Sequence, residues 1–506
     1  MFLGFDLGTT NVKAQVVDAA GRIVGAGAAP VERWVTPDGG VEQDIEQIWA
    51  ATRSAIGQAA AGCGAQIQAI GVSSQGGAVQ ILDDHDRPLH RVISWLDRRG
   101  APFDRELIQS VGADWLAAHV GHGGSSMTLG QVLRLNSQSP SLLRPPHRLG
   151  FVGDVIVGRL CGRRAHDPTS LAIALLYNPW IRRADPELLA RLSLDEGQLP
   201  DLVPLDRPAG GLPTQVAAEL GLTAGIPVAP AVHDQYAAAL GAGALAPGEI
   251  NFGAGTAWVL LANTARLAQP IVASAFVAPH PVPGVWGQML SLVNGGSAIE
   301  WALRLVGQTR ASLEDIDRYA EQSPPGSAGL RCWPLLLPGA EPHARSQCGG
   351  SLERITLAHG PPHLVRAVLE GLACELARHL RVLTQAGFPA QKILMSGSAA
   401  ASRTTPQLLA DVLDLPVTCV NTSYVSALGA AMIARSLWAS GDLVDVARSW
   451  LPPGRTIDPG PQHAIYAPLL AEYLESFQEP ICAEHAHRVS AKPCREPDHW
   501  EAGFPG

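Results

Sequence analysis

Short apolar runs alternate along this chain with longer stretches in which apolar residues recur every three or four positions. Residues 2–6 and 12–18 predict two strands joined by a polar turn, because the first run is apolar and the second alternates. Residues 45–59 predict a helix whose apolar stripe of Ile45, Ile48, Trp49, Ile56 and Ala59 is interrupted at Thr52. Further strands are predicted at 67–72, 78–82, 92–96, 226–232, 250–260 and 289–293, and further helices near 297, at 362–386, at 406–413 and from 426. This alternation predicts an α/β fold.

The opening strand pair recurs in the second half of the chain. At one constant offset, Phe5, Gly8, Thr9 and Val12 are matched by Phe252, Gly255, Thr256 and Val259. An offset near half of the 506 residues indicates two domains built on the same unit, and a chain of this length also exceeds what one core supports. We therefore predict an N-terminal domain at 1–246, a C-terminal domain at 247–480 and an irregular tail at 481–506.

The composition is that of a globular protein, with 46% hydrophobic and 16% charged residues. A net charge of −9 and the lack of a Lys/Arg cluster argue against nucleic acid or an anionic membrane as the main partner, which leaves small molecules. The first residues lack the basic head and apolar region of a secretory leader, and no run of roughly 18 apolar residues occurs. We therefore expect a cytoplasmic protein.

The eight cysteines are widely spaced and include no Cys-x-x-Cys pair, which is typical of reduced, mostly buried thiols. The tail holds a group of candidate metal ligands, Cys482, His485, His487, Cys494 and His499. In an irregular terminal segment, a chance cluster is favoured over a zinc site.

An acid at a predicted strand end, Asp234, is the first candidate catalytic residue. It follows the apolar run 226–232 and precedes a segment of small residues, so it lies where a buried strand gives way to a helix. Ligands of open α/β sheets collect beyond the carboxyl ends of strands. A helix N-cap is the alternative interpretation, and for a lone Asp it is the default.

The turn between the first two strands has the chemistry of a phosphate-binding loop. Gly8 allows backbone N–H groups to approach an anion, and the hydroxyls of Thr9 and Thr10 add donors. Asp6 at the strand end is suited to a hydrated Mg²⁺. A simple hairpin turn explains these residues equally well. The second copy has Gly253 in place of the acid, as expected if two unequal loops hold one polyphosphate.

Other strand ends carry polar or small residues that a ligand could contact. The strand at 67–72 ends in a polar and flexible segment, Ser73-Ser74-Gln75-Gly76-Gly77. Asp97 follows another strand, where a structural ion pair with Arg98 is at least as good an explanation as substrate contact. Ser297 begins a helix and either caps it or contacts an anion or ribose. Small residues at 396–402 allow a flat ring to lie on the backbone.

Together these segments resemble the FGGY carbohydrate kinases of the actin/hexokinase-like ATPase superfamily. The resemblance rests on segments in the family's order and spacing: Gly4-Phe5-Asp6-Leu7-Gly8-Thr9-Thr10, Trp95-x-Asp97-Arg98-Arg99, Asp234 with Gly241-x-Gly243, and Gly253-x-Gly255-Thr256. It extends to 427–431 and so covers nearly the whole chain. It implies two ribonuclease H-like domains, each with a mixed sheet, and a cleft between them.

The resemblance also implies roles for the candidate residues. Asp234 would be the general base and, with Asp6, would position Mg²⁺. ATP would be held by Gly8, Thr9, Thr10, Asn11, Gly255, Thr256, Ser297, Gly397, Ser398, Ala399 and Ser402. The acceptor would contact Gln75, Gly76, Gly77, Trp95, Asp97, Asp234 and Gln235. We thus expect an ATP- and Mg²⁺-dependent kinase of a small, xylulose-like ketose or polyol, with a homodimer as a candidate assembly.

Three departures from the family pattern leave the acceptor open. Xylulose kinases usually have Gln-Met-His-Gly, and glycerol kinases Gln-Arg-Glu, where this chain has Gln75-Gly76-Gly77. Neither substrate carries over, and we expect the two glycines to enlarge the pocket. Residues 397–402 replace the family's Gly-Gly-Gly-Ala-Arg-Ser and add methyl groups beside the adenine. Gly339-Ala340-Glu341-Pro342 stands where xylulose kinases have Gly-Glu-Arg-Thr-Pro.

Two other classes of function stay open on the sequence. The altered adenine loop motivates a sugar-binding or regulatory protein on the same fold with weak or no turnover, although Asp6 and Asp234 are both present. An actin-like or chaperone-like ATPase would hydrolyse ATP at a rate indifferent to added carbohydrate.

Overall fold

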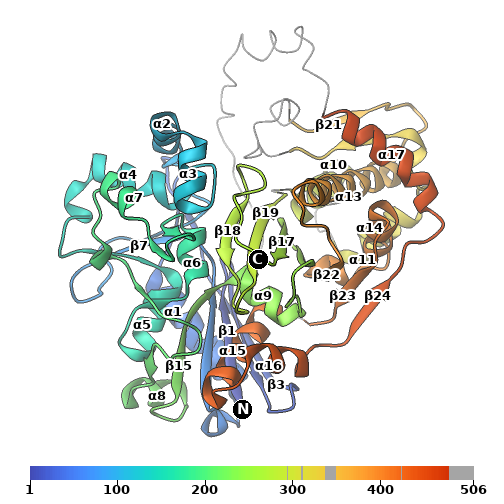
Figure 1. Cartoon of the computed structure of the whole chain (residues 1–506). Coiled ribbons are helices and arrows are strands. Elements are labelled where there is room, and N and C mark those ends of the chain that lie inside the picture. The colour runs from blue at the N-terminus through green and yellow to red at the C-terminus, as the bar shows by residue number, and fades with distance from the viewer. Residues whose placement is uncertain (293, 309–311, 337–348, 423, 478–506) are drawn as a thin grey trace.

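Two large mixed sheets organise the chain, one in each half (Figure 1). The computed structural model describes residues 1–477 except 293, 309–311, 337–348 and 423. The predicted tail at 481–506, with its Cys/His group, and the departure at 339–342 lie outside the described residues. The predicted α/β class with two sheet-containing domains is confirmed, whereas the domain limits at 246 and 480 stay predictions.

The first sheet has eight strands in the order β13-β10-β15-β6-β1-β2-β3, with β14 paired to β15. They are β1 (Phe2–Leu7), β2 (Asn11–Val17), β3 (Ile23–Pro30), β6 (Ala69–Ser74), β10 (Ala165–His166), β13 (Asp201–Leu202), β14 (Gly210–Gly211) and β15 (Pro227–His233). A five-stranded sheet flanks it, ordered β4 (Trp34–Val35), β5 (Val41–Gln43), β8 (Val92–Ile93), β7 (Val79–Leu82) and β9 (Arg148–Phe151).

The second sheet has seven strands in the order β18-β19-β17-β16-β22-β23-β24. They are β16 (Glu249–Ala254), β17 (Trp258–Thr264), β18 (Phe276–Pro279), β19 (Trp286–Ser291), β22 (Lys392–Ser396), β23 (Val417–Val420) and β24 (Gly454–Ile457). Two strand pairs stand apart, β11 (Tyr177–Asn178) with β12 (Arg183–Ala184) and β20 (Arg331–Trp333) with β21 (Ser351–Glu353).

The repeat predicted from the sequence is confirmed in the strand pairing. β1 pairs antiparallel with β2 and parallel with β6. In the same way, β16 pairs antiparallel with β17 and parallel with β22. Each half therefore contains a hairpin whose first strand pairs with a parallel strand, and the two hairpin turns occupy equivalent positions.

Helices cover both sheets (Figure 1). They are α1 (Ile45–Ala59), α2 (Ala101–Val111), α3 (Ala113–Val120), α4 (Thr128–Gln138), α5 (Val152–Cys161), α6 (Pro168–Ile173), α7 (Pro186–Arg191), α8 (Thr214–Leu220), α9 (Asp234–Ala242), α10 (Gly296–Leu305), α11 (Leu313–Glu321), α13 (Pro361–Gln385), α14 (Thr405–Leu413), α15 (Val425–Ala439), α16 (Leu443–Ser449) and α17 (His463–Glu475). Within the described part of the chain, none is both long and apolar enough to span a bilayer.

The local sequence of helix α1 determines where the helix begins and which of its side chains are buried. Asp44 caps it by accepting the backbone N–H of Glu46 at 2.8 Å. Thr52, which interrupts the apolar stripe, is fully buried, because its hydroxyl donates to the carbonyl of Ile48 one turn earlier at 2.7 Å. Trp49 is half-buried and packs against the core, so it lies at the edge of the predicted buried face.

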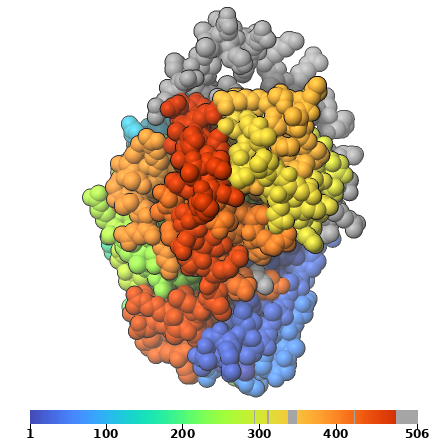
Figure 2. All heavy atoms as spheres, turned by 90° about the vertical axis from the view of Figure 1, so that its right-hand side faces the viewer, coloured from blue at the N-terminus to red at the C-terminus, as the bar shows by residue number. Residues whose placement is uncertain are grey.

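Helix α15 comes late in the chain but packs on the first sheet, against β1 and β6 (Figure 1). The approach needs glycines, because a Cβ atom at Gly4 or Gly71 would overlap backbone carbonyls of α15, and one at Gly429 would overlap the carbonyl of Ala237. Nearby, the indole of Trp450 donates to the carbonyl of Ala19 at 3.3 Å. Figure 2 shows orange-red residues of the late chain lying against blue N-terminal residues.

Candidate active site

Three adjacent parallel strands bring several predicted site residues together. β6 lies between β1 and β15, and their register places Asp6 opposite Ser73 and His233 opposite Ser74. Gln75 follows β6 directly, and Asp234 is the first residue after β15. Asp6, Gln75 and Asp234 therefore share the carboxyl-terminal edge of the sheet, where ligands of α/β proteins bind.

The carboxylates of Asp6 and Asp234 influence each other electrostatically. Burial and the charge of Asp234 raise the pKa of Asp6 to about 6, although Ser73 donates a hydrogen bond to Asp6 Oδ1 at 2.7 Å. Burial also raises the pKa of Asp234 to about 6, opposed by hydrogen bonds from Gln235. The side chain of Asp234 is 28% exposed and so reachable by a ligand. Two close acids of this kind favour a shared proton or a cation.

Helix α9 begins at Asp234, but its N-cap is His233. His233 Nδ1 accepts the backbone N–H of Gln235 at 3.4 Å, and His233 Nε2 lies 3.4 Å from Asp234 Oδ1. Burial lowers the pKa of His233 to about 3, so the imidazole is neutral. The N-cap is therefore His233 and not Asp234, although the Asp234 carboxylate also accepts a hydrogen bond from the backbone of Gln235.

A closed ring of hydrogen bonds joins the first hairpin turn to the neighbouring elements. Trp95 Nε1 donates to the hydroxyl of Thr9 at 3.0 Å, and that hydroxyl donates to Gln75 Oε1 at 3.1 Å. Gln75 Nε2 donates to Gln43 Oε1 at 3.2 Å, and Gln43 Nε2 donates to the carbonyl of Thr9 at 3.0 Å. These hydrogen bonds hold Thr9, Gln75 and Trp95 in one cluster.

The expectation that Gly76 and Gly77 enlarge the pocket is wrong. A Cβ atom at Gly76 would lie 2.6 Å from His233 Cδ2 and 2.8 Å from Ile173 Cγ2. One at Gly77, where φ is +72°, would lie 2.8 Å from the sulfur of Met127. Side chains from other elements already fill the space that the glycines leave, so no larger pocket results.

Asp97 is committed to a structural ion pair. Its carboxylate is fully buried and pairs with Arg99 at 2.7 Å, and it also accepts from the backbone of Val41 and the side chain of Gln131. Burial alone would raise the pKa of Asp97, but the hydrogen bonds from Arg99 hold it below its ordinary value. The geometry favours the ion-pair interpretation over substrate contact, with Arg99 and not Arg98 as the partner.

The second hairpin turn is tied to the start of α10. The N–H groups of Gly296 and Ser297 donate to the carbonyls of Gly255 and Thr256, each at 3.0 Å. These two N–H groups are therefore used within the protein. They brace the turn, and only the remaining groups of Gly255, Thr256 and Ser297 can face a ligand.

The turn after β22 lies beside the second hairpin, because β22 pairs with β16. Gly397 has a φ of +93°, and a Cβ atom there would lie 2.8 Å from the carbonyl oxygen of Ala254. Ser398 is exposed and Ala399 is buried. Ser402 is fully buried and donates to Asp317 Oδ1 at 2.5 Å, so its hydroxyl anchors the turn to α11. The geometry thus argues against direct nucleotide contact by Ser402.

Gln235 contacts both Asp234, one acid of the Asp6–Asp234 pair, and the second hairpin. Its backbone and side chain donate to Asp234. Its side-chain oxygen would lie 3.3 Å from a Cβ atom at Gly253, the position equivalent to Asp6 in the repeat. An acid at Gly253 would therefore crowd Gln235, which gives a physical reason for the asymmetry between the two hairpins.

Two residues of this region were missed from the sequence. They are Gln43, just before α1, and His233, just before Asp234, and the sequence pattern assigns no role to either. A buried glutamine before a helix gives no signal of a partner 32 residues away. A His directly before a candidate base was a usable signal, since imidazole is a frequent partner of acids.

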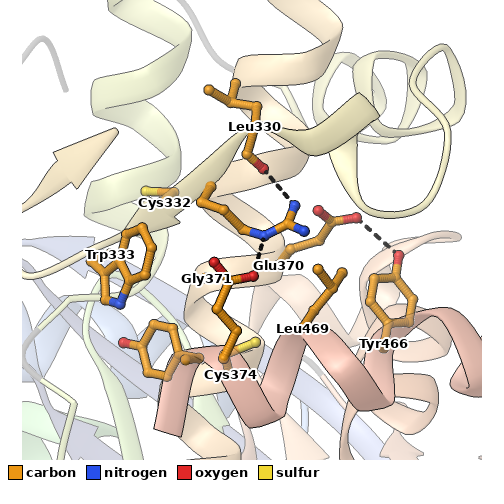
Figure 3. A pocket seen from close by; sticks show the side chains of 11 residues that line it. Leu330, Cys332, Trp333, Glu370, Gly371, Cys374, Tyr466 and Leu469 are labelled. Carbon is orange, nitrogen blue, oxygen red and sulfur yellow. Dashed lines mark hydrogen bonds and ion pairs between the residues drawn. The ribbon is translucent and has the colours of Figure 1, made fainter. Parts of the chain in front are cut away.

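A small cavity in the second half of the chain is a separate feature. It lies between β20, α13 and α17, and Figure 3 shows its lining side chains. Arg331 donates to Glu472 at 3.2 Å and Tyr466 donates to Glu370 at 3.0 Å, which closes its walls with polar contacts. Its volume of about 20 Å³ leaves room for about one water molecule, so it is not a sugar or nucleotide site.

Two mixed sheets share the same hairpin arrangement and carry candidate ligand-binding residues at their strand ends. They define a two-domain fold of the actin-like ATPase class. Residues 1–241 match the N-terminal domain, and residues 250–438 the C-terminal domain, of the FGGY family of carbohydrate kinases. The chain belongs to this family. It is accordingly a phosphotransferase with an alcohol group as acceptor, in a family that uses ATP as a substrate.

The similar proteins are kinases named for different acceptors. The chain is 28% identical to a glycerol kinase of Rhodospirillum centenum, covering 94% of this chain and 97% of the relative. It is 27% identical to an L-fuculokinase of Escherichia coli, covering 85% and 91%. A crystal structure of a "xyloylose kinase" from Brucella ovis is 28% identical with a TM-score of 0.85, covering 96% and 99%. The sequence identities to these three kinases are nearly equal, so they do not indicate which acceptor this chain uses.

Proposed function

We propose that the protein transfers the γ-phosphate of ATP to a hydroxyl of a small ketose or polyol, with Asp234 as the general base. The observation that carries the proposal is the pair Asp6 and Asp234 at adjoining strand ends, with mutually unfavourable charges and a partly exposed Asp234. Phosphoryl transfer depends on positioning and charge neutralisation, and both need carboxylates at the point of reaction.

Asp234 is suited to accept the proton of the acceptor hydroxyl. Its pKa of about 6 is closer to neutral pH than that of an ordinary aspartate, and it is still ionised at pH 7. As the hydroxyl oxygen bonds to the γ-phosphorus, its proton passes to an Asp234 oxygen and the bond to the ADP oxygen breaks. Gln235 keeps the carboxylate oriented by donating to it from backbone and side chain.

Asp6 and Asp234 also fit a Mg²⁺ ion. Hard cations take carboxylate and water oxygens, and Asp6 keeps Oδ2 available beyond its bond from Ser73 through Oδ1. Burial raises the pKa of both acids, and the charge of Asp234 adds to this effect at Asp6, which supports a cation beside the pair. Bound there, Mg²⁺ would neutralise phosphate charge during transfer.

The two hairpin turns would hold the phosphates from opposite sides. Thr10 is exposed at the first turn, next to Gly8 and Asn11. Gly255 and Thr256 form the second turn, braced by α10. The turn at 397–399 adjoins the second hairpin and would border the adenine, whose flat ring needs a wall of small residues. Ser297 stays a candidate through its side chain.

The acceptor would lie at the first sheet, between Trp95, the backbone of 75–77, Asp234 and Gln235. Trp95 is 37% exposed, so its ring offers an apolar face to a sugar while its N–H stays bonded to Thr9. The side chain of Gln75 is held in the hydrogen-bond ring, and so it would act chiefly by orienting Thr9 and Trp95.

A coupled ADP-release screen over C3 to C7 ketoses, polyols and sugar acids tests the proposal. We expect one acceptor class to stimulate ADP release in the presence of Mg²⁺. Asp234→Asn should lower kcat on the best acceptor by roughly 10²–10⁴, whereas Asp114→Asn, at an exposed site on α3, should leave it unchanged. Full activity of Asp234→Asn would refute the base assignment, and ATP turnover indifferent to every carbohydrate would refute the kinase proposal.

A further inference from the structure

The side chain of His233 occupies the space next to Gly76. A Cβ atom at Gly76 would lie 2.6 Å from His233 Cδ2 and 2.7 Å from His233 Nε2, closer than side-chain carbons approach in folded proteins. The imidazole is itself 94% buried, because the side chain of His233 is 6% exposed. His233 can therefore point into this space because residue 76 is a glycine.

The two ring nitrogens of His233 face different groups. Nδ1 accepts the N–H of Gln235, which fixes the remaining proton of the neutral ring on Nε2. Nε2 lies 3.4 Å from Asp234 Oδ1, so the two groups are close without a hydrogen bond between them in the free protein. A contact of this length in the free protein can shorten to a hydrogen bond once an acceptor hydroxyl docks.

We infer that His233 is the positioning residue of Asp234, seated in the space left by Gly76, and that it takes over the part of the acceptor-site wall that a side chain at position 76 would form. The inference rests on the proposed function, because positioning matters only if Asp234 is the base. His233 spans the first turn of α9: one ring nitrogen accepts the N–H of Gln235, and the other lies 3.4 Å from an Asp234 oxygen.

The arrangement of His233 and Gly76 also affects which acceptor the site selects. With Gly76 and Gly77 carrying no side chains and Gln75 held by Thr9 and Gln43, the 75–77 turn offers the acceptor mainly its backbone. The position of the Asp234 carboxylate, set by His233, then decides which hydroxyl of a bound polyol reaches the base. The chemical class of ligand stays a small polyhydroxy compound.

A pair of conservative variants separates positioning from capping. Asn at position 233 reproduces the reach of Nδ1, so His233→Asn keeps the cap but loses the contact with Asp234. Gln reproduces the reach of Nε2, so His233→Gln keeps that contact. We expect His233→Asn to lower kcat by about 10- to 100-fold with an unchanged KM for ATP, and His233→Gln to recover at least about 10-fold of the loss. Equal kcat values for the two variants would overturn the inference.

A thermal unfolding cycle tests the steric pairing without any acceptor. Gly76→Ala should lower Tm by about 3 °C or more in the wild-type background. In a His233→Ala background the same change should cost less than half as much, because only Ile173 then remains in contact. An equal cost in both backgrounds would overturn the pairing. If the pairing holds and Asp234→Asn stays fully active, it is the proposed function that fails, so the two failures are distinguishable.

Discussion

The indole N–H of Trp95 donates to the hydroxyl of Thr9 at 3.0 Å, and this bond links two regions of the proposed site. Trp95 belongs to the side where the acceptor would bind, and Thr9 belongs to the hairpin turn that would hold phosphate. Because the Thr9 hydroxyl also donates to Gln75, its orientation is fixed before any ligand arrives.

Trp95→Phe keeps an aromatic ring but removes the donor to Thr9. We expect kcat/KM to fall about 3- to 10-fold, the effect of one lost hydrogen bond, when initial rates are measured on the best acceptor. Trp438→Phe is the matched control, since Trp438 packs on Phe2 at the opposite end of β1. A loss of similar size in the control would mean that the bond to Thr9 is not the cause.

Asp6→Asn removes one of the two charges that suit the site to Mg²⁺. The Mg²⁺ concentration for half-maximal activity should rise by about 10-fold or more, as measured by titrating Mg²⁺ at constant free ATP. Asp114→Asn is the control, because Asp114 is an exposed acid on α3. An unchanged Mg²⁺ requirement in Asp6→Asn would contradict the assignment.

Asp234→Asn should make the protein more stable at pH 7.5 while abolishing most activity. The pKa of Asp6 and of Asp234 is raised to about 6, so ionising both costs the folded state free energy above pH 6. Removing one charge should stabilise the folded state by about 1–2 kcal/mol. In buffer without divalent cations, this gain should raise Tm by about 1–4 °C. The gain should shrink as pH falls from 7 to 4, because both acids become protonated. A lower Tm at pH 7.5 would contradict the repulsion between them.

Gly429→Ala tests the close packing of α15 on the first half of the chain. The added Cβ would overlap the carbonyl oxygen of Ala237, and backbone on both sides cannot yield, so the variant should lose about 3 kcal/mol or more. Denaturant unfolding measures the loss. Gly57→Ala in α1 is the control, with no atom within 4 Å of the new Cβ, and it should gain about 0.5–1 kcal/mol.

The strands and hairpins of both sheets could be predicted because their signals are local. Apolar runs and a polar turn locate β1, β2, β16 and β17, and the repeat links them into one pattern. Asp6 and Asp234 were found for the same reason, since a strand end followed by an acid can be read from adjacent residues.

The relationships that depend on tertiary packing could not be predicted. Gly76 suggested an empty space, but the space is filled by His233 from a neighbouring strand. Arg98 is the nearer neighbour of Asp97 in sequence, yet the fold selects Arg99 as its partner. Ser402 resembled a ligand-facing serine, yet burial against α11 directs its hydroxyl to Asp317. In each case the contact depends on how the chain packs in three dimensions, and the periodicity of apolar residues carries no information about it.

The packing of α15 on β1 and β6 also constrains the order of events during synthesis. β1 ends at Leu7, whereas α15 ends at Ala439. The face of the first sheet around Gly4 and Gly71 therefore stays bare while most of the chain emerges from the ribosome. A two-domain protein usually completes its N-terminal domain first, but here the first sheet is finished only when the second domain is nearly made. Any chain that terminates before α15 keeps that apolar face open to aggregation.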